Sequence, residues 1–95
     1  MKITCTTAEA RKAASLALEV VVSDIHDMTR RLVEAKDKKP SAVPAIQGLM
    51  KNADETAKAL GRMIQALGSC IGSVELSDSE TMLLAYSAKK ETPNE

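Results

Sequence analysis

Apolar residues between positions 46 and 74 recur at heptad spacing. Steps of seven from Ile46 reach Val74 through alanine and leucine residues, and two neighbouring rows widen the stripe. This spacing is typical of an amphipathic helix that packs along another helix. We therefore predict a helix over 42–75 whose stripe is a packing surface. The three rows are Ile46, Ala53, Leu60, Leu67 and Val74; Leu49, Thr56, Met63 and Cys70; and Met50, Ala57, Ile64 and Ile71.

A second amphipathic helix is predicted over 7–36. Thr6 and Glu9 have the spacing of a capping box, in which each side chain bonds the backbone of the other residue. Apolar residues then recur in steps of three and four. They are Ala10, Ala14, Leu18, Val21, Ile25, Met28, Leu32 and Ala35.

A turn at 37–41 separates the two helices. Pro40 disfavours helical geometry in the residue before it. Ser41 is a candidate cap of the next helix, and Pro44 suits its first turn. Two helices of similar length with a short turn between them form an antiparallel hairpin.

The chain is therefore predicted to be all-α: an antiparallel two-helix hairpin with a short C-terminal helix over 78–88. Ser77 and Glu80 repeat the capping-box spacing at the start of that short helix. We expect a single helical-hairpin domain over 1–88 and a disordered polar tail over 89–95.

The stripes divide the apolar residues into a core and a surplus. The predicted hairpin core consists of Leu18, Val21, Ile25, Met28, Leu32, Ile46, Leu49, Ala53, Leu60, Met63, Ile64, Leu67, Ile71 and Val74. Four further residues lie off the main stripe of the first helix: Leu16, Val20, Val22 and Val33. A lone hairpin would expose them, and contiguous exposed apolar surface usually marks an interface. We predict a dimer, with itself or with a similar small helical protein, that pairs into a four-helix bundle through these four residues.

Three glycines of the predicted helix over 42–75 have helical spacing. Gly61, Gly68 and Gly72 are separated by seven and four residues. A strip of glycines allows another helix to approach closely, but glycine also relaxes the end of a helix. The sequence leaves both interpretations open.

Composition narrows the range of partners. Hydrophobic residues make up 44% of the chain and the only aromatic residue is Tyr86, so aliphatic side chains must fill the core. The formal net charge of zero argues against a nucleic-acid partner and against attraction to an anionic membrane. Basic residues nevertheless gather near the predicted turn, either as a solvated tip or as a partner-docking patch. They are Arg30, Arg31, Lys36, Lys38, Lys39 and Lys51.

Candidate chemistry is sparse. His26 is the only histidine, and Cys5 and Cys70 have no metal-ligand spacing. No nucleophile or phosphate-loop motif is present. We therefore expect neither an enzyme nor a bound metal or cofactor. An antiparallel hairpin could bring Cys5 near Cys70, so free thiols and a disulfide both remain open.

Targeting signals are also lacking. No segment is apolar enough to insert into a bilayer, and the start has no conventional signal peptide. We expect a cytoplasmic protein, or one secreted without a cleavable signal peptide.

Roughly residues 2–80 resemble the small ESX-like helical proteins of type VII secretion, a group similar to the Trp-x-Gly superfamily. The similar features are Lys2-Ile3-Thr4, Thr7-Ala8-Glu9-Ala10, two arms of about equal length, and Ile71-Gly72-Ser73-Val74. More narrowly, the chain resembles the sub-group without the Trp-x-Gly turn that accompanies Leu-x-Gly toxins in Gram-positive bacteria. This resemblance implies a non-enzymatic partner, targeting factor or chaperone that binds the helical N-terminal region of a larger effector.

The end of the second predicted helix departs from that family. Its members often carry an aromatic residue and an aspartate, four residues apart, as an export signal just after Ser-Val. Here Ser73 and Val74 are followed by Asp78, and no phenylalanine is present. The resemblance makes these three residues a candidate export signal that is altered or completed by a partner.

Two alternatives stay open. The turn Pro40-Ser41-Ala42-Val43-Pro44 is similar to that of type III secretion needle subunits, although its proline spacing is one residue longer. Needle subunits end with their second helix, whereas this chain continues beyond it. The other alternative is a cytosolic adaptor or structural bundle that resembles part of a vinculin-like or talin-like rod.

Overall fold

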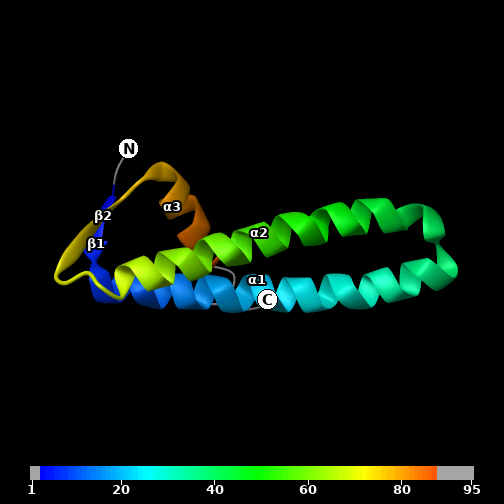
Figure 1. The fold of residues 1–95 in the computed structure, drawn as a ribbon, viewed down its shortest axis with the longest axis horizontal. Coiled ribbons are helices and arrows are strands. Elements are labelled where there is room, and N and C mark those ends of the chain that lie inside the picture. Colours follow the sequence, from blue (N-terminus) through cyan, green and yellow to red (C-terminus); the bar gives the residue numbers. More distant parts are fainter. Residues whose placement is uncertain (1–2, 88–95) are drawn as a thin grey trace, which may run out of the picture.

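The computed structural model describes residues 3–87 as a helical hairpin with a small sheet at one end. The elements are β1 (Ile3–Thr6), α1 (Thr7–Lys38), a 3₁₀ turn (Pro40–Ala42), α2 (Val43–Leu67), β2 (Ser73–Leu76) and α3 (Asp78–Leu84). Figure 1 shows α2 running back along α1, with the sheet and α3 at the end away from the turn. The predicted helical character is confirmed, and the molecule measures 51 × 29 × 23 Å. The tail predicted over 89–95 and Ala88 lie outside the described residues.

The start of α1 is fixed by the predicted capping box. The backbone N–H of Thr6 donates to Glu9 Oε1 at 3.1 Å, and the backbone N–H of Glu9 donates to Thr6 Oγ1 at 3.1 Å. The hydroxyl of Thr6 also donates to Glu9 Oε1 at 2.9 Å. These donors, first the backbone N–H of Thr6 and then its hydroxyl, hold the pKa of Glu9 below its ordinary value of 4.5.

The prediction that the second helix continues to residue 75 is wrong. α2 ends at Leu67, and Gly72 adopts a φ of +83°, a left-handed conformation that favours glycine. The backbone N–H of Thr7 donates to Gly72 O at 2.8 Å, which ties this turn to the start of α1. The chain then leaves Gly72 as the strand β2.

β1 and β2 form a two-stranded antiparallel sheet in which Cys5 pairs with Val74. β-branched residues suit strands, and both partners contain them. Leu76 is buried, and Cys5 and Val74 pack beside it, whereas Ser73 and Glu75 are exposed. This alternation is the two-residue period of a half-buried strand. The sheet therefore covers the open end of the hairpin with one apolar face.

Two hydrophobic clusters form the core. The first, next to the sheet, consists of Ala10, Ala14, Met63, Leu67 and Leu76. The second consists of Ala17, Val21 and Leu60, against which Leu83 and Tyr86 of the C-terminal segment pack. α3 reaches this position from a second capping box, in which the backbone N–H of Ser77 donates to Glu80 Oε1 at 2.9 Å.

The half of the hairpin nearer the turn is less well covered. Among the described hydrophobic residues of this half, only Ala35 is buried. Met28, Leu32 and Ile46 are half-buried. The core is therefore concentrated in the half that the sheet and α3 cover.

Most of the predicted core residues lie in or against the two clusters. Val21, Leu60, Met63 and Leu67 are buried, and five others pack partly buried against these clusters: Leu18, Ile25, Ala53, Ile64 and Val74.

Two predicted core residues are exposed, so their assignment was wrong. Ile71, 95% exposed, lies in the loop after α2 because the helix has already ended. Leu49, 56% exposed, lies on the part of α2 that α3 does not reach. Ser41 was also wrongly assigned as a cap, because it lies within the 3₁₀ turn and α2 has no side-chain cap.

Replacing Leu60 by alanine should lower the free energy of unfolding by about 3 kcal/mol, because Leu60 is fully buried and the substitution leaves a cavity. Urea denaturation followed by circular dichroism measures the loss. The change Ile71→Ala should cost within about 0.5 kcal/mol, because that side chain is 95% exposed in the loop after α2. Equal losses for the two variants would contradict this placement of the core.

The capping box of α1 should make stability depend on pH. Because the pKa of folded Glu9 is lowered, its carboxylate stabilises the fold above its unfolded pKa, and that contribution is lost as the pH falls below about 4.5. Glu9→Gln retains a capping side chain without a titrating group. Urea denaturation should therefore show a smaller loss on acidification for Glu9→Gln than for the native chain. Glu55→Gln, at an exposed site outside both capping boxes, serves as the control.

Candidate helix-docking surface

An apolar groove runs along one face of α1. We call it the α1 groove and define it by Ser15, Leu18, Glu19, Val22, Ser23, His26 and Ile64, with a volume of about 540 Å³. Six of these residues come from α1 at steps of three and four, which places them on one side of that helix. Ile64 contributes the wall from α2.

The chemistry of the α1 groove suits an aliphatic side chain. Leu18 packs partly buried against the second cluster, Val22 is 39% exposed, and Ser15 and Ser23 occupy little volume. Among residues 3–87, Glu19 and His26 are the only titratable groups that line it. One carboxyl and one imidazole at the edge of an apolar groove form no nucleophile or metal arrangement. The α1 groove is therefore suited to packing.

One further exposed apolar residue lies on this side of α1 beyond the groove. Val33 is 65% exposed and lies eleven residues after Val22, close to three helical turns of about 3.6 residues. The two valines therefore share a side of α1. The other two predicted interface residues, Leu16 and Val20, are half-buried and do not line the groove. The structure thus brings Val22 and Val33 into line and separates them from Leu16 and Val20.

Gly61 lies beside this groove without a local reason to be glycine. It precedes Ile64 by three residues on α2, and a Cβ at Gly61 would meet nothing within 4 Å. Gly68 and Gly72, in contrast, belong to the turn after α2. A glycine inside a helix costs about 1 kcal/mol relative to alanine. Of the three candidates for close helix approach, only Gly61 faces open space within a helix.

A second groove separates α3 from α2. We call it the α3 groove; its volume is about 660 Å³ and its lining residues are Thr56, Ala59, Ser79, Met82, Leu83, Ala85 and Tyr86. Met82 is 73% exposed at its edge. The α1 groove and the α3 groove share no residue. The hairpin therefore presents two separate apolar surfaces.

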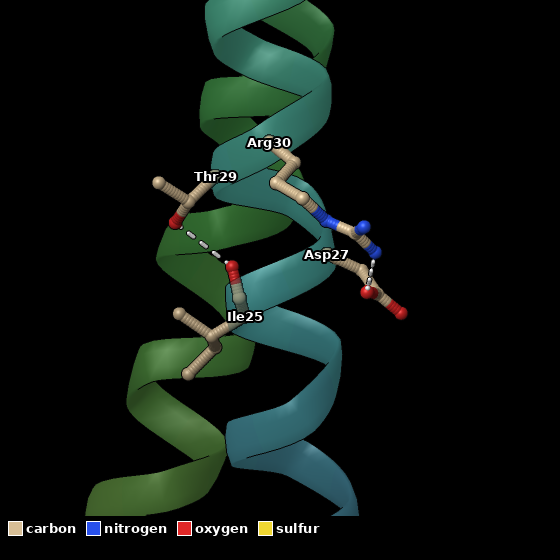
Figure 2. A network of polar contacts seen from close by, with 4 residues as sticks. All are labelled: Ile25, Asp27, Thr29 and Arg30. Atoms are coloured by element: carbon tan, nitrogen blue, oxygen red, sulfur yellow. Dashed lines mark hydrogen bonds and ion pairs between the residues drawn. The ribbon is translucent and has the colours of Figure 1, made fainter.

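Arg30, in the basic cluster near the turn, forms an ion pair with a residue of its own helix. Figure 2 shows Arg30 paired with Asp27 at 2.6 Å, three residues back on α1, and the Thr29 hydroxyl donating to Ile25 O at 2.9 Å. The Arg30 and Asp27 side chains are 80% and 49% exposed, so this pair contributes less than about 1 kcal/mol. These contacts stay within one helix.

The predicted export residues do not share one element. Ser73 and Val74 belong to β2, whereas Asp78 is the first residue of α3. They therefore lie outside the helix on which the sequence placed the first two, and their export role stays a prediction.

Both cysteines are free: Cys5 is half-buried on β1, and the exposed Cys70 donates from Sγ to Ala66 O at 3.4 Å. Within residues 3–87, no group of three or more His, Cys, Asp or Glu side chains could hold a metal ion. No helix in the same range is long and apolar enough to cross a membrane. Comparison of the chain with protein-family models, curated proteins and solved structures finds no match.

Replacing Gly61 by alanine should raise the free energy of unfolding by about 1 kcal/mol, because it removes the helix penalty of glycine and the new methyl group meets open space. Thermal and urea denaturation measure the gain. Gly72→Ala is the opposite control and should destabilise the fold, because position 72 needs a positive φ. A loss of stability in Gly61→Ala would show that the chain itself requires this glycine.

Proposed function

We propose that this protein is a non-enzymatic partner that binds a helix of another protein along its hairpin. The observation that carries the proposal is the alignment of the α1 groove with the exposed Val33 farther along the same helix face. An amphipathic helix recognises such a surface by placing residues spaced by three, four and seven into it. Gly61 beside the groove would let that helix approach closely.

Burial supports this proposal energetically. Each Å² of apolar surface removed from water contributes about 25 cal/mol, so several hundred Å² would match the whole stability of a small domain. The half of the hairpin near the turn has only Ala35 buried among its described hydrophobic residues and would gain most from a partner. A helical hairpin laid alongside this one, from a second copy or a similar small protein, would complete the proposed four-helix bundle.

The proposed biological role is that of a targeting partner in type VII secretion. Support comes from the resemblance of residues 2–80 to small ESX-like proteins and from the hairpin with an open apolar face. In this role the chain would bind the helical N-terminal region of a larger effector, such as a Leu-x-Gly toxin, and would act as its chaperone or targeting factor.

The alternatives have less support. A needle-like subunit would end with its second helix, whereas here β2 and α3 follow α2 and pack back on the hairpin. A cytosolic adaptor would use the same groove, and the identity of the bound helix distinguishes it from a secretion partner.

Binding should fail when both exposed valines become acidic. We propose co-expression of the chain with the helical N-terminal domain of a Leu-x-Gly toxin encoded beside its gene. The native chain should co-purify with that domain in a fixed ratio. Val22→Glu combined with Val33→Glu should abolish co-purification while circular dichroism stays helical, because an unpaired carboxylate cannot be buried against an apolar helix.

Ala66→Glu is the control for this experiment, because position 66 is exposed and lines neither groove. It should co-purify as the native chain does. Equal binding by the native chain and the double variant would remove the α1 groove as the docking site. A gene neighbourhood without any protein that has a helical N-terminal domain would count against the type VII role.

A further inference from the structure

α3 covers only part of the hairpin face on which it lies. Its segment packs Leu83 and Tyr86 against the second cluster and forms the α3 groove with Thr56 and Ala59 of α2. Figure 1 shows α3 near the sheet end, with the rest of α2 extending past it to the turn. The α3 groove therefore lies at the boundary between two parts of this hairpin face. α3 covers the part near the sheet, and it leaves uncovered the part toward the turn, which we call the bare stretch.

The bare stretch has its own exposed apolar residue. Leu49 precedes Thr56 by seven residues, or two helical turns, so it lies on the side of α2 that faces the α3 groove. Leu49 is 56% exposed, whereas Leu60, at the level that α3 covers, is fully buried. α3 therefore buries the apolar residues of this face near the sheet, and no described element does the same at Leu49.

α3 also has apolar surface to offer. Leu83 packs against the second cluster of its own chain, whereas Met82 beside it is 73% exposed. A symmetric dimer requires each copy to present both halves of the contact. This chain has both, since the outer side of α3 is one half and the bare stretch around Leu49 is the other.

The charges of the two halves are opposite. Residues 30–51 contain six Lys and Arg against two Asp and Glu, a formal charge of +4. Residues 73–87 contain Glu75, Asp78 and Glu80 and no Lys or Arg, a formal charge of −3. On α1, the heptad row of Ala17, a member of the cluster on which α3 packs, continues through Asp24 to the basic residues Arg31 and Lys38 near the turn. Opposite charges on the two halves favour their contact and fix its orientation.

From this shape and charge we propose that a second copy of this chain docks on the α3 face in antiparallel orientation. The α3 of each copy then covers the bare stretch around Leu49 of the other, and the acidic segment 73–87 lies against the basic segment 30–51. The inference rests on the proposed helix-binding function and names one partner. It uses the α3 face and leaves the α1 groove open for the helix of a different protein.

The first test is the mass of the full chain in solution. Sedimentation velocity and light scattering should give twice the mass of one chain, with weaker association at high salt because the paired charges are screened. The mass of a single chain at all concentrations would overturn the proposal. That result is expected if a segment of the same chain covers this face. A filament would also overturn it, because a closed two-fold pair cannot extend.

The second test compares two substitutions of the same kind on the two surfaces. Leu49→Glu should give a folded monomer, whereas Val33→Glu should leave the dimer intact, although both side chains are exposed in the single chain. Circular dichroism should show equal helicity for the two variants. Loss of the dimer in Val33→Glu and not in Leu49→Glu would place the second copy on the α1 groove face and overturn the proposal.

The third test exchanges the charges. Arg31→Glu with Lys38→Glu, and separately Glu75→Lys with Asp78→Lys, should each weaken self-association by at least about tenfold, because every reversal acts twice in a symmetric pair. Mixing the two variants should restore association, since each acidic segment again faces a basic one. Arg11→Glu with Arg62→Glu, at exposed positions outside both segments, is the control and should associate normally.

Failure of the mixture to recover would overturn the antiparallel charge match even if both variants fold. These results also separate this inference from the proposed function. A native chain that binds the toxin domain but stays a single copy would overturn only the second-copy proposal. A dimer that binds no toxin domain would leave the second-copy proposal standing.

Discussion

The contact of α1 with α2 through small side chains is the constraint on which the rest of the structure depends. The buried hydrophobic positions of α1 nearest the sheet are Ala10, Ala14 and Ala17, and larger residues of α2 such as Leu60, Met63 and Leu67 complete the clusters. Because the only aromatic residue is Tyr86, the core is a thin aliphatic layer. A thin layer between two helices has two open sides, and both apolar grooves lie at its edges.

The elements at the sheet end compensate for that thin core. β1 and β2 add Leu76 to the first cluster, and α3 adds Leu83 to the second. Each strand leads directly into a capped helix, through Thr6 and Glu9 in one case and Ser77 and Glu80 in the other. A two-stranded sheet is marginal on its own, so its packing against the helices stabilises both. Nothing among the described residues does the same for the half near the turn.

The two grooves follow from this uneven coverage of the core. The α1 groove lies on a side of α1 that no described element covers, and the α3 groove lies between α3 and α2. Apolar exposure at Val33 and Leu49 extends both surfaces toward the turn. Two such faces fit the proposed binding of other helices. Opposite charges on the basic segment 30–51 and the acidic segment 73–87 would fix the orientation of the proposed contact between two copies.

The sequence by itself determined the helices, the caps of α1 and α3, and most of the residues that touch the core. Local signals were sufficient there, since capping boxes and heptad spacing act over a few residues. The tertiary structure decided that residues 73–76 form a strand and not the end of a helix, because β2 pairs with β1 from the other end of the chain. It also decided that Ile71 and Leu49 are exposed although they follow the stripe. Helical periodicity places a side chain on one side of its helix, but only the packing of distant elements determines whether anything covers that side.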